Sequence, residues 1–471
     1  MIAVTAYRGE RVAVFGLGRS GLAVAAALRA GGAEPVLWDD NHRQRDGASA
    51  AGFRVEDMAT LDWTRVAALV LSPGVPLTHP EPHPVVRAAR GASVPILGDM
   101  ELFQMARADL PAHKVVAVTG TNGKSTTTAL IGHVLGGSGR AAAVGGNIGA
   151  PVLALDPLDE GGVYVLELSS YQIDLTEAFV PDVGVFLNLT PDHLDRHGDM
   201  AGYATAKERL FTRQCAGQTA VIGVDDAHGL RFADRLHAQG TVRVIPISGA
   251  RLLAGGVAVQ NGTLYDQIAG QLTPVGSLSK APALRGQHNG QNAAAAYAAC
   301  RALGLDANTI LDAFATFPGL AHRMQRVATA NGIEFVNDSK ATNVDAAARA
   351  LASFDNIYWI AGGRPKTTDL SGLEALFPRI RRAYLIGEAA AGFAESLDGK
   401  VDWVMAGDLG TAVTQAWADA KGRGRAVILL SPACASFDQF PNFEARGDAF
   451  AAAVRALLGR DTPSAAEGGR P

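Results

Sequence analysis

The stretch KVVAVTGTNGKSTTTALIGHVL, at residues 114–135, constrains the fold of this chain more than any other feature. An apolar, strand-like run leads into a glycine turn, and a lysine and two hydroxyl residues then open a helix. Glycines in such a turn let backbone N–H groups approach phosphate oxygens, and the lysine adds a positive charge. The pattern therefore predicts a nucleoside triphosphate site in an α/β fold.

The spacing of this loop differs from the strict P-loop consensus. Val118 stands where a further glycine is expected, five residues before Gly123. This difference sets the chain apart from ordinary P-loop GTPases. The alternative is a plain strand–helix turn with a solvated lysine, but an apolar strand that runs straight into this motif argues against it. The residues expected to contact ATP here are Gly120, Thr121, Asn122, Gly123, Lys124, Ser125 and Thr126.

Strand-like and helix-like segments alternate along the 471 residues, which predicts α/β architecture with mostly parallel sheets. This length exceeds one ordinary domain. We expect a Rossmann-like N-terminal domain at 1–108, a central P-loop-type ATPase domain at 109–319 and a Rossmann-like α/β C-terminal domain at 320–471. The tail from about residue 461 has a disordered composition. Asn261-Gly262 between two strand-like runs predicts a hairpin.

Composition narrows the class of protein. The net charge of −4 offers no electrostatic basis for binding nucleic acid. The three cysteines are far apart and contain no CxxC pair, which favours a reducing compartment and argues against zinc. No signal peptide is recognisable and no apolar run approaches the ~20 residues of a membrane span. We therefore expect a cytoplasmic enzyme that does not insert into membranes.

A second glycine-rich loop, GLGRSG, follows the first strand-like run. It places Gly16, Gly18 and Gly21 before a helix, and Asp39 ends the next strand, as in the dinucleotide-binding fingerprint. Taken alone, this loop would indicate an NAD enzyme. Because such a loop recognises a diphosphate, UDP is physically as reasonable as NAD.

Three further clusters carry candidate chemistry. Glu167 ends a strand in VLELSSYQID, where a carboxylate can ligate Mg²⁺, although a lone acid at a strand end is often incidental. His193 lies in NLTPDHLDRHG and Lys207 in the helical stretch YATAKERLF, where a solvated surface lysine is the simpler interpretation. Asn289 and Asn292 share one helix face and can bind a nucleotide or serve as a cap and a polar surface.

Together these motifs carry a family resemblance. GTNGKST, ELSSYQ, NLTPDHLDRHG with Lys207 behind it, and HNGQN resemble the central domain of the Mur ligases and folylpolyglutamate synthetases. FPGLAHRMQRV, FVNDSKATNVDAA, IAGGRPKTTDLS and SPACASFDQF resemble the C-terminal domain of the Mur ligases that add D-glutamate. The aspartate-asparagine-proline-arginine signature of diaminopimelate-adding members is absent. The resemblance spans the chain except for its tail.

The resemblance implies a reaction. ATP phosphorylates the carboxylate of UDP-N-acetylmuramoyl-L-alanine, and the amine of D-glutamate then attacks the acyl phosphate, giving an amide, ADP and phosphate. Such an enzyme would serve peptidoglycan synthesis, and with it cell shape and division, and is expected to be a monomer. The third domain would have to swing inward to complete the site. Two Mg²⁺ ions, or Mn²⁺ in their place, are implied, with Lys207 carbamylated by CO₂ so that it can serve as an anionic ligand.

The resemblance also implies roles for individual residues. The catalytic residues are Lys124, His193 and Lys207, and the metal ligands are Ser125, Glu167, His193 and the Lys207 carbamate. Further ATP contacts are Asn289, Asn292, Arg323 and Asp338. The UDP-substrate site comprises Gly18, Arg19, Ser20, Asp39, Asp40, Asn41, Ser72, Gly74, Asn147 and His193. The D-glutamate site comprises Lys340, Thr342, Lys366, Ser436, Phe437 and Phe443.

Two rival functions stay open on the sequence alone. A folylpolyglutamate-type synthetase would share the central domain and the acyl-phosphate chemistry, but it would not need the diphosphate loop at residues 16–21. A nucleotide-sensing regulatory protein would explain that loop, but it would not need Lys124, Glu167, His193 and Lys207 together.

Overall fold

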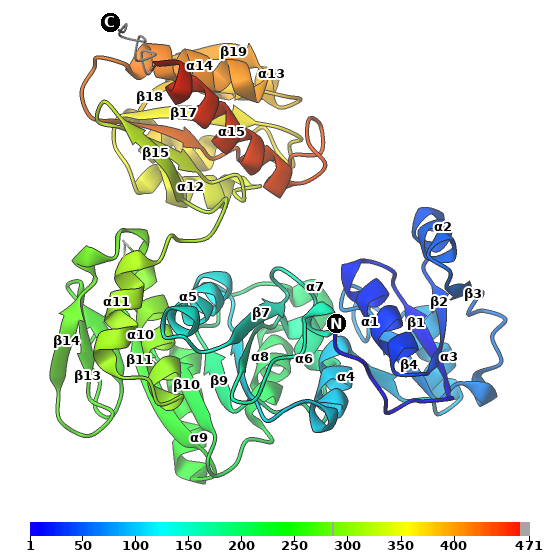
Figure 1. Cartoon of the computed structure of the whole chain (residues 1–471). Coiled ribbons are helices and arrows are strands. Elements are labelled where there is room, and N and C mark those ends of the chain that lie inside the picture. The colour runs from blue at the N-terminus through cyan, green and yellow to red at the C-terminus, as the bar shows by residue number, and fades with distance from the viewer. Residues whose placement is uncertain (285–286, 462–471) are drawn as a thin grey trace, which may run out of the picture. The chain divides into compact units, whose positions relative to one another are not determined.

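The computed structural model describes residues 1–284 and 287–461. Within them the fold is α/β, as the sequence predicts: three mostly parallel sheets carry helices on their faces (Figure 1). Contacts divide the chain into two compact units, Met1–Phe317 with the first two sheets and the part from Pro318 onward with the third. The tail expected to be disordered falls on residues 462–471, which lie outside the described residues.

The first sheet is entirely parallel, with the strand order β3-β2-β1-β4-β5. Its strands are β1 (Arg11–Phe15), β2 (Glu34–Trp38), β3 (Arg54–Val55), β4 (Ala68–Leu71) and β5 (Ile96–Leu97). Its helices are α1 (Arg19–Ala30), α2 (His42–Ala50), α3 (Pro84–Gly91) and α4 (Asp99–Ala106). The strand order reverses between β1 and β4, so the GLGRSG loop after β1 lies where doubly wound sheets bind ligands.

The second sheet has the order β14-β13-β12-β11-β10-β9-β6-β8-β7. Its strands are β6 (Lys114–Thr119), β7 (Ala142–Gly146), β8 (Val163–Glu167), β9 (Val183–Phe186), β10 (Thr219–Gly223), β11 (Arg243–Ser248), β12 (Val257–Gln260), β13 (Thr263–Asp266) and β14 (Thr273–Ser277). The helices are α5 (Lys124–Gly137), α6 (Ser170–Asp174), α7 (Leu194–His197), α8 (Met200–Glu208), α9 (Ala227–Gln239), α10 (Gln287–Ala302) and α11 (Ala307–Thr316). Strands β6 to β12 are parallel, and the predicted Asn261-Gly262 hairpin is confirmed, with both residues at positive φ between antiparallel β12 and β13.

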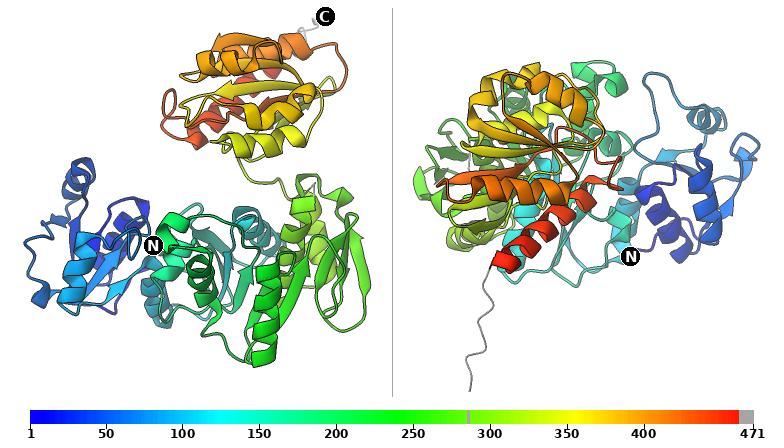
Figure 2. Two further views of the ribbon diagram at one scale, coloured as in Figure 1. Left: turned by 180° about the vertical axis from the view of Figure 1, so that it is seen from behind. Right: turned by 90° about the horizontal axis from the view of Figure 1, so that it is seen from above.

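The strands of this sheet are apolar on both faces because helices cover both. In β6, Val116 and Val118 belong to the cluster formed with α5, α10 and α11. Val115 and Ala117 face the opposite way and join a cluster that continues into the first sheet through Val12 and Val14. This shared core explains why the first two sheets form one unit (Figure 2).

The alanine-rich helix α10 is a core element. Every residue from Ala293 to Cys300 is at most 1% exposed, so the helix is apolar around its whole circumference there. Its small side chains allow close packing against α5 and the sheet. Among residues 1–284 and 287–461, no helix is long and apolar enough to cross a bilayer.

The third sheet, in the second unit, has the order β15-β16-β20-β17-β18-β19 and is parallel except for the β15–β16 pair. Helices α12 and α13 cover one face, and α14 and α15 cover the other. The strands are β15 (Gln325–Ala330), β16 (Ile333–Asn337), β17 (Ile357–Gly362), β18 (Ile380–Ile386), β19 (Trp403–Gly407) and β20 (Ala426–Leu430). The helices are α12 (Val344–Ala352), α13 (Ala390–Leu397), α14 (Leu409–Ala420) and α15 (Phe443–Asp461).

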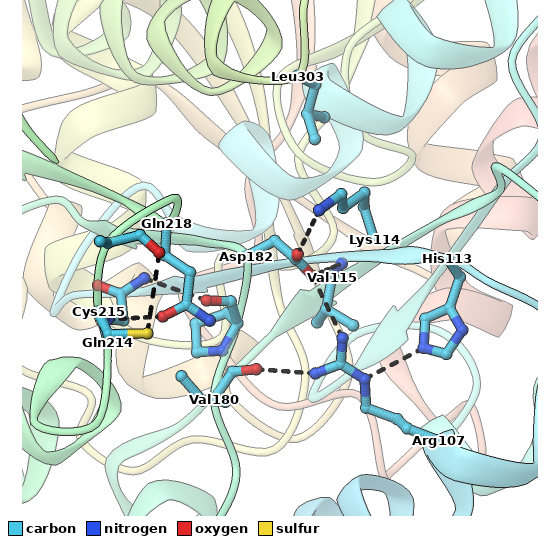
Figure 3. A network of polar contacts seen from close by, with 12 residues as sticks. Arg107, His113, Lys114, Val115, Val180, Asp182, Gln214, Cys215, Gln218 and Leu303 are labelled. Atoms are coloured by element: carbon cyan, nitrogen blue, oxygen red, sulfur yellow. Dashed lines mark hydrogen bonds and ion pairs between the residues drawn. The ribbon is translucent and has the colours of Figure 1, made fainter. Parts of the chain in front are cut away.

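A polar network ties the start of β6 to the segment that follows α4. Asp182 accepts hydrogen bonds from Lys114 Nζ at 2.8 Å, from the Val115 N–H at 2.9 Å and from Arg107 at 3.2 Å. Arg107 also donates to the Val180 carbonyl at 2.8 Å and to His113 at 3.1 Å (Figure 3). These contacts lie at the amino end of β6, away from the glycine loop at its carboxyl end.

We expect Asp182→Ala to lower the free energy of unfolding of the first unit by about 2–4 kcal/mol, because it removes the acceptor of the Val115 N–H and the carboxylate that pairs with the largely buried Arg107. Thermal or denaturant unfolding measures the change. Turnover per folded molecule should be unchanged. The control is Asp156→Ala, because Asp156 is 95% exposed and its ion pair with the N-terminus should contribute less than about 1 kcal/mol. Equal effects of the two variants would contradict the assignment.

Candidate active site

The phosphate-binding loop, residues 120–123, joins β6 to α5. Gly120 and Gly123 have φ values of 143° and 85°, which favour glycine. A Cβ on Gly123 would also lie 2.2 Å from Asn292 Oδ1. Val118 is fully buried in β6, so the position where the consensus has another glycine belongs to the strand here. The shortened loop follows from a strand that runs on to Thr119.

Two lysines share acceptors on this loop. Lys124 Nζ donates to the carbonyls of Gly120 at 3.0 Å and Thr121 at 2.9 Å. Lys207 Nζ donates to the same Gly120 carbonyl at 2.9 Å and makes a longer contact with Thr119 Oγ1 at 3.4 Å. The sequence therefore brings together two lysines that are 83 positions apart, on α5 and α8.

Lys207 is 1% exposed, so the solvated-lysine interpretation does not apply. Burial lowers the pKa of its amine well below the ordinary value, and the charge of Lys124 lowers it further. The carboxylates of Asp192 and Glu167 act in the opposite direction. The Tyr203 ring lies 4.7 Å from Lys207 Nζ. Burial therefore makes this amine easier to deprotonate than a lysine in water.

Glu167 ends β8 and is 3% exposed. Its Oε1 accepts a hydrogen bond of 2.7 Å from Asn147 Nδ2, whereas its buried Oε2 has no hydrogen-bond partner among the described residues. A buried carboxylate oxygen without a donor is costly unless a cation or water completes it. Glu167 therefore fits the role of a cation ligand. The part of the chain that the structure describes holds no group of three or more His, Cys, Asp or Glu side chains arranged for a metal.

His193 lies on the segment between β9 and α7, in the left-handed backbone conformation with a φ of 54°. Its side chain is 45% exposed and lies 3.4 Å from Asp192. The Tyr171 ring, 4.9 Å away between centroids, packs beside it. His193 is thus available to a ligand on the same edge of the sheet as Glu167, because both follow the carboxyl ends of parallel strands.

Asn292 lies against the phosphate-binding loop at Gly123. It is 4% exposed, and its Oδ1 accepts from Thr127 Oγ1 at 3.4 Å while its Nδ2 donates to Asn289 Oδ1 at 3.0 Å. These contacts place the pair of asparagines on α10 directly against the first turn of α5.

The first-sheet residues expected to bind a diphosphate surround the GLGRSG loop. Asp39 accepts from the Leu17 N–H at 2.6 Å and from the Asn41 N–H at 2.8 Å, and Ser72 Oγ donates to the Gly16 carbonyl at 2.7 Å. Asn41 caps α2, and Asp40 pairs with His83 at 3.1 Å. Arg19, which opens α1 directly after Gly18 and before Ser20, reaches the Gly149 carbonyl at 3.4 Å.

Arg196 connects the loop that follows β4 in the first sheet with the part of the chain that carries the second sheet. Its guanidinium donates to the carbonyls of Gly74 at 2.8 Å and Val75 at 3.0 Å, and it lies 4.6 Å from the centre of the Tyr171 ring. The loop after β4 is thereby fixed beside the segment that carries His193. The sequence does not single out Arg196, because an arginine in such a segment is usually solvated.

In the second unit, most of the residues expected to bind D-glutamate follow the carboxyl ends of the adjacent strands β16, β20 and β17. Lys340 Nζ lies 5.4 Å from the centre of the Phe443 ring, and the Thr342 N–H donates to the Lys340 carbonyl. Ser436 is buried, whereas Lys366 is exposed and Phe437 is 64% exposed.

Arg446 is buried beneath the loops that follow β16 and β20 and forms hydrogen bonds with both of them. It is 1% exposed and donates to Ser339 Oγ at 3.0 Å and to the carbonyls of Ser339 at 2.9 Å and Cys434 at 3.0 Å. The sequence gives no signal for this arginine, because it sits in an ordinary helical stretch. Asp338 directly follows β16, and its carboxylate accepts hydrogen bonds from the Ser431 hydroxyl and the Met324 N–H. Burial raises the pKa of Asp338 to about 6. Arg323 lies in the same unit and its charge lowers that pKa.

Comparisons with known proteins agree with this arrangement. The Mur ligase middle domain matches residues 118–300, and the Mur ligase glutamate ligase domain matches residues 322–434. The chain is 53% identical over 461 residues to a UDP-N-acetylmuramoylalanine–D-glutamate ligase of Caulobacter vibrioides, covering 97% of this chain and 98% of the relative. A ligase of the same name from Rhizobium etli is 53% identical over 462 residues, covering 98% and 97% of the two chains.

Solved structures agree in fold. A UDP-N-acetylmuramoyl-L-alanyl-D-glutamate–2,6-diaminopimelate ligase is 20% identical, with a TM-score of 0.57 over 85% of this chain and 94% of the other. The UDP-N-acetylmuramate-alanine ligase of Thermotoga maritima is 17% identical, with a TM-score of 0.55 over 95% and 99%. The loop, the buried lysine and the full-length similarity lead to one conclusion: the chain belongs to the Mur ligase family.

Proposed function

We propose that this protein joins D-glutamate to UDP-N-acetylmuramoyl-L-alanine at the expense of ATP, giving ADP and phosphate, as a cytoplasmic step of peptidoglycan precursor synthesis. The observation that carries the proposal is the arrangement of Lys124, Lys207 and the unpaired Glu167 oxygen around the phosphate-binding loop. Relatives that are 53% identical over nearly the whole chain bear the name of this ligase, which supports the choice of substrates.

The loop binds the triphosphate of ATP, and Lys124 neutralises charge on its terminal phosphates. The carboxylate of the UDP-linked substrate attacks the γ-phosphorus, a P–O bond forms, and the bond to ADP breaks. The D-glutamate amine then attacks the acyl carbon of the resulting acyl phosphate, loses a proton, and phosphate leaves as the amide forms. Holding the carboxylate in line with the γ-phosphate supplies much of the rate.

The residues present fit a magnesium site. Ser125, which is largely buried at the start of α5, and Glu167, with its unpaired Oε2, would hold one ion, and His193 with Lys207 would help to hold a second. When bound, Mg²⁺ neutralises charge on the phosphoryl group that is transferred. The protein's own part is to keep Glu167 oriented through Asn147 and to keep Lys207 buried.

Carbamylation of Lys207 would make it a ligand. The neutral amine that burial favours adds to CO₂, a C–N bond forms, and a proton is released to solvent, leaving an anionic carbamate. The change replaces a buried amine by an anion beside the positive charge of Lys124, so that the two side chains attract each other. Asn289, Asn292, Arg323 and Asp338 remain proposed ATP contacts.

The other two substrates have separate sites in this proposal. The UDP moiety binds at the GLGRSG loop and Asp39, with Asn147 and His193 near the sugar-peptide portion. D-Glutamate carries two carboxylates, so its site needs cations and backbone donors, which Lys340, Lys366 and the turn at Ser436 provide.

The first test is phosphate release from ATP in the presence of UDP-N-acetylmuramoyl-L-alanine. We expect release that depends on D-glutamate, with little from L-glutamate, from meso-diaminopimelate or without an amino acid. Lys124→Ala should lower kcat/KM by about 100-fold or more, because phosphate charge is no longer neutralised. Release with a different amino acid would reject the D-glutamate assignment, and nucleotide binding without release in any mixture would favour the sensing protein.

The Lys207 proposal has its own test. Lys207→Ala should reduce turnover by about 100-fold or more, and formate or acetate should restore part of it by supplying the missing carboxylate oxygens. Labelling with ¹³CO₂ should give a carbamate carbon signal in the wild type that is absent from Lys207→Ala. Rescue that fails, together with a wild type that takes up no label, would overturn the carbamate. Lys114→Ala, a lysine at the other end of β6, is the matched control and should retain full turnover.

A further inference from the structure

We infer that Asn188 is a positioning residue of this site: it sets the orientation of the phosphate-binding loop and, through the loop, the places of Lys124 and Lys207. The inference rests on the proposed use of ATP. Asn188 follows β9 and contributes both its backbone and its side chain to the loop.

Asn188 holds the N–H edges of two successive peptide units. The Thr121 N–H donates to the Asn188 carbonyl at 2.9 Å, and the Asn122 N–H donates to Asn188 Oδ1 at 2.9 Å. Asn188 Nδ2 completes the contact by donating to the Asn122 carbonyl at 3.2 Å. The side chain thus brackets Asn122 from both sides.

The two lysines hold the opposite edges of the same peptide units. The Gly120 carbonyl belongs to the unit that ends in the Thr121 N–H, and it accepts from both Lys124 and Lys207. The Thr121 carbonyl belongs to the unit that ends in the Asn122 N–H, and it accepts from Lys124. Because C=O and N–H point in opposite directions in a trans peptide, fixing one edge fixes the other. Asn188 therefore determines where both lysine acceptors point.

The Asp225 carboxylate, acting through Gln291, determines which side of the Asn188 amide carries the oxygen and which the nitrogen. Asp225 Oδ2 accepts from Gln291 Nε2 at 2.9 Å, and a carboxylate can only accept, so the Gln291 amide nitrogen must face it. Gln291 Oε1 then faces Asn188 and accepts from its Nδ2 at 2.8 Å. This leaves Asn188 Oδ1 for the Asn122 N–H. The relay Asp225–Gln291–Asn188 thus has one permitted direction.

The relay is itself anchored. Asp225 also accepts from Ser248 Oγ at 2.5 Å and from the Gly249 N–H at 2.8 Å, which ties it to the end of β11. Gln291 is 8% exposed on α10. The phosphate-binding loop is therefore held by Asn188 after β9, by Asp225 after β10 and by α10. Asn292 of α10 also lies against Gly123, at the end of the loop that leads into α5.

A consequence follows for nucleotide binding. The N–H groups of Thr121 and Asn122 already have acceptors within the protein, so in this arrangement these two groups serve to hold the loop and do not point at a phosphate oxygen. The contacts of Asn188 with the loop assign it no direct part in the reaction, and its effect on turnover would act through the loop and the two lysines.

The test compares Asn188→Ala and Asn188→Asp with the wild type. Asn188→Ala keeps the backbone bond to Thr121 but removes the side-chain bonds to Asn122 and Gln291, so we expect a roughly tenfold rise in the Kd and KM for ATP and a fall of similar size in kcat. Asn188→Asp should be more harmful, because its second oxygen would face the Asn122 carbonyl and Gln291 Oε1. Gln291→Ala should change the ATP constants in the same direction by about threefold.

The readouts separate positioning from general destabilisation. ATP binding and UDP-substrate binding are each measured by calorimetry without D-glutamate, alongside the thermal midpoint. The UDP-substrate Kd should stay within about twofold. The matched control is Gln214→Ala, a buried amide that bonds to the Pro181 and Thr219 carbonyls at the other end of the sheet; it should lower the midpoint without changing ATP binding.

Unchanged ATP binding in both Asn188 variants would overturn the inference, and so would equal losses for ATP and the UDP substrate. A wild type that binds no ATP would overturn both the inference and the proposed function. A wild type that binds ATP in an Asn188-dependent manner but shows no D-glutamate-dependent turnover would keep the inference and reject the proposed reaction.

Discussion

Two peptide planes between β6 and α5 carry the geometry of this site. Their carbonyl edges accept from Lys124 and Lys207, and their N–H edges donate to Asn188. Opposing hydrogen bonds on a planar unit leave it little freedom to rotate, so contacts within the protein hold this loop of four residues. Glycines at its two ends supply the backbone angles that such a tight connection requires.

Burial gives these contacts their chemical meaning. A lysine in water would keep its proton, but Lys207 is enclosed by the sheet, Tyr203 and the loop, and it lies near the charge of Lys124. The same enclosure leaves Glu167 Oε2 without a donor. Because the surroundings of both groups are of low polarity, the electrostatic interaction of each group with a nearby ion is stronger than it would be in water. The fold therefore buries an amine and a carboxylate, Lys207 and Glu167, beside the carboxyl ends of neighbouring strands.

The parallel sheets explain why residues far apart in the sequence meet. Strands β6, β8 and β9 are neighbours, so the loop after β6, Glu167 at the end of β8 and Asn188 after β9 share one edge. In the second unit the same rule collects Lys340 and Ser436 from the ends of β16 and β20. Sequence reasoning selected the loop, Glu167, His193 and Lys207 as candidates, because each stands in a motif. It did not select Asn188, Arg196 and Arg446, because amides and arginines at such places are usually solvated.

The sequence by itself determined the α/β class, the shortened loop with its lysine and hydroxyls, and the hairpin at Asn261-Gly262, because these depend on local spacing and on backbone angles that few residues adopt. It could not decide whether Lys207 lies in solvent or in the core, because a helix shows only its period and not what packs on each face. The tertiary structure decided that question, together with the direction of the Asp225–Gln291–Asn188 relay. Both depend on burial and on contacts between strands and helices that local sequence does not encode.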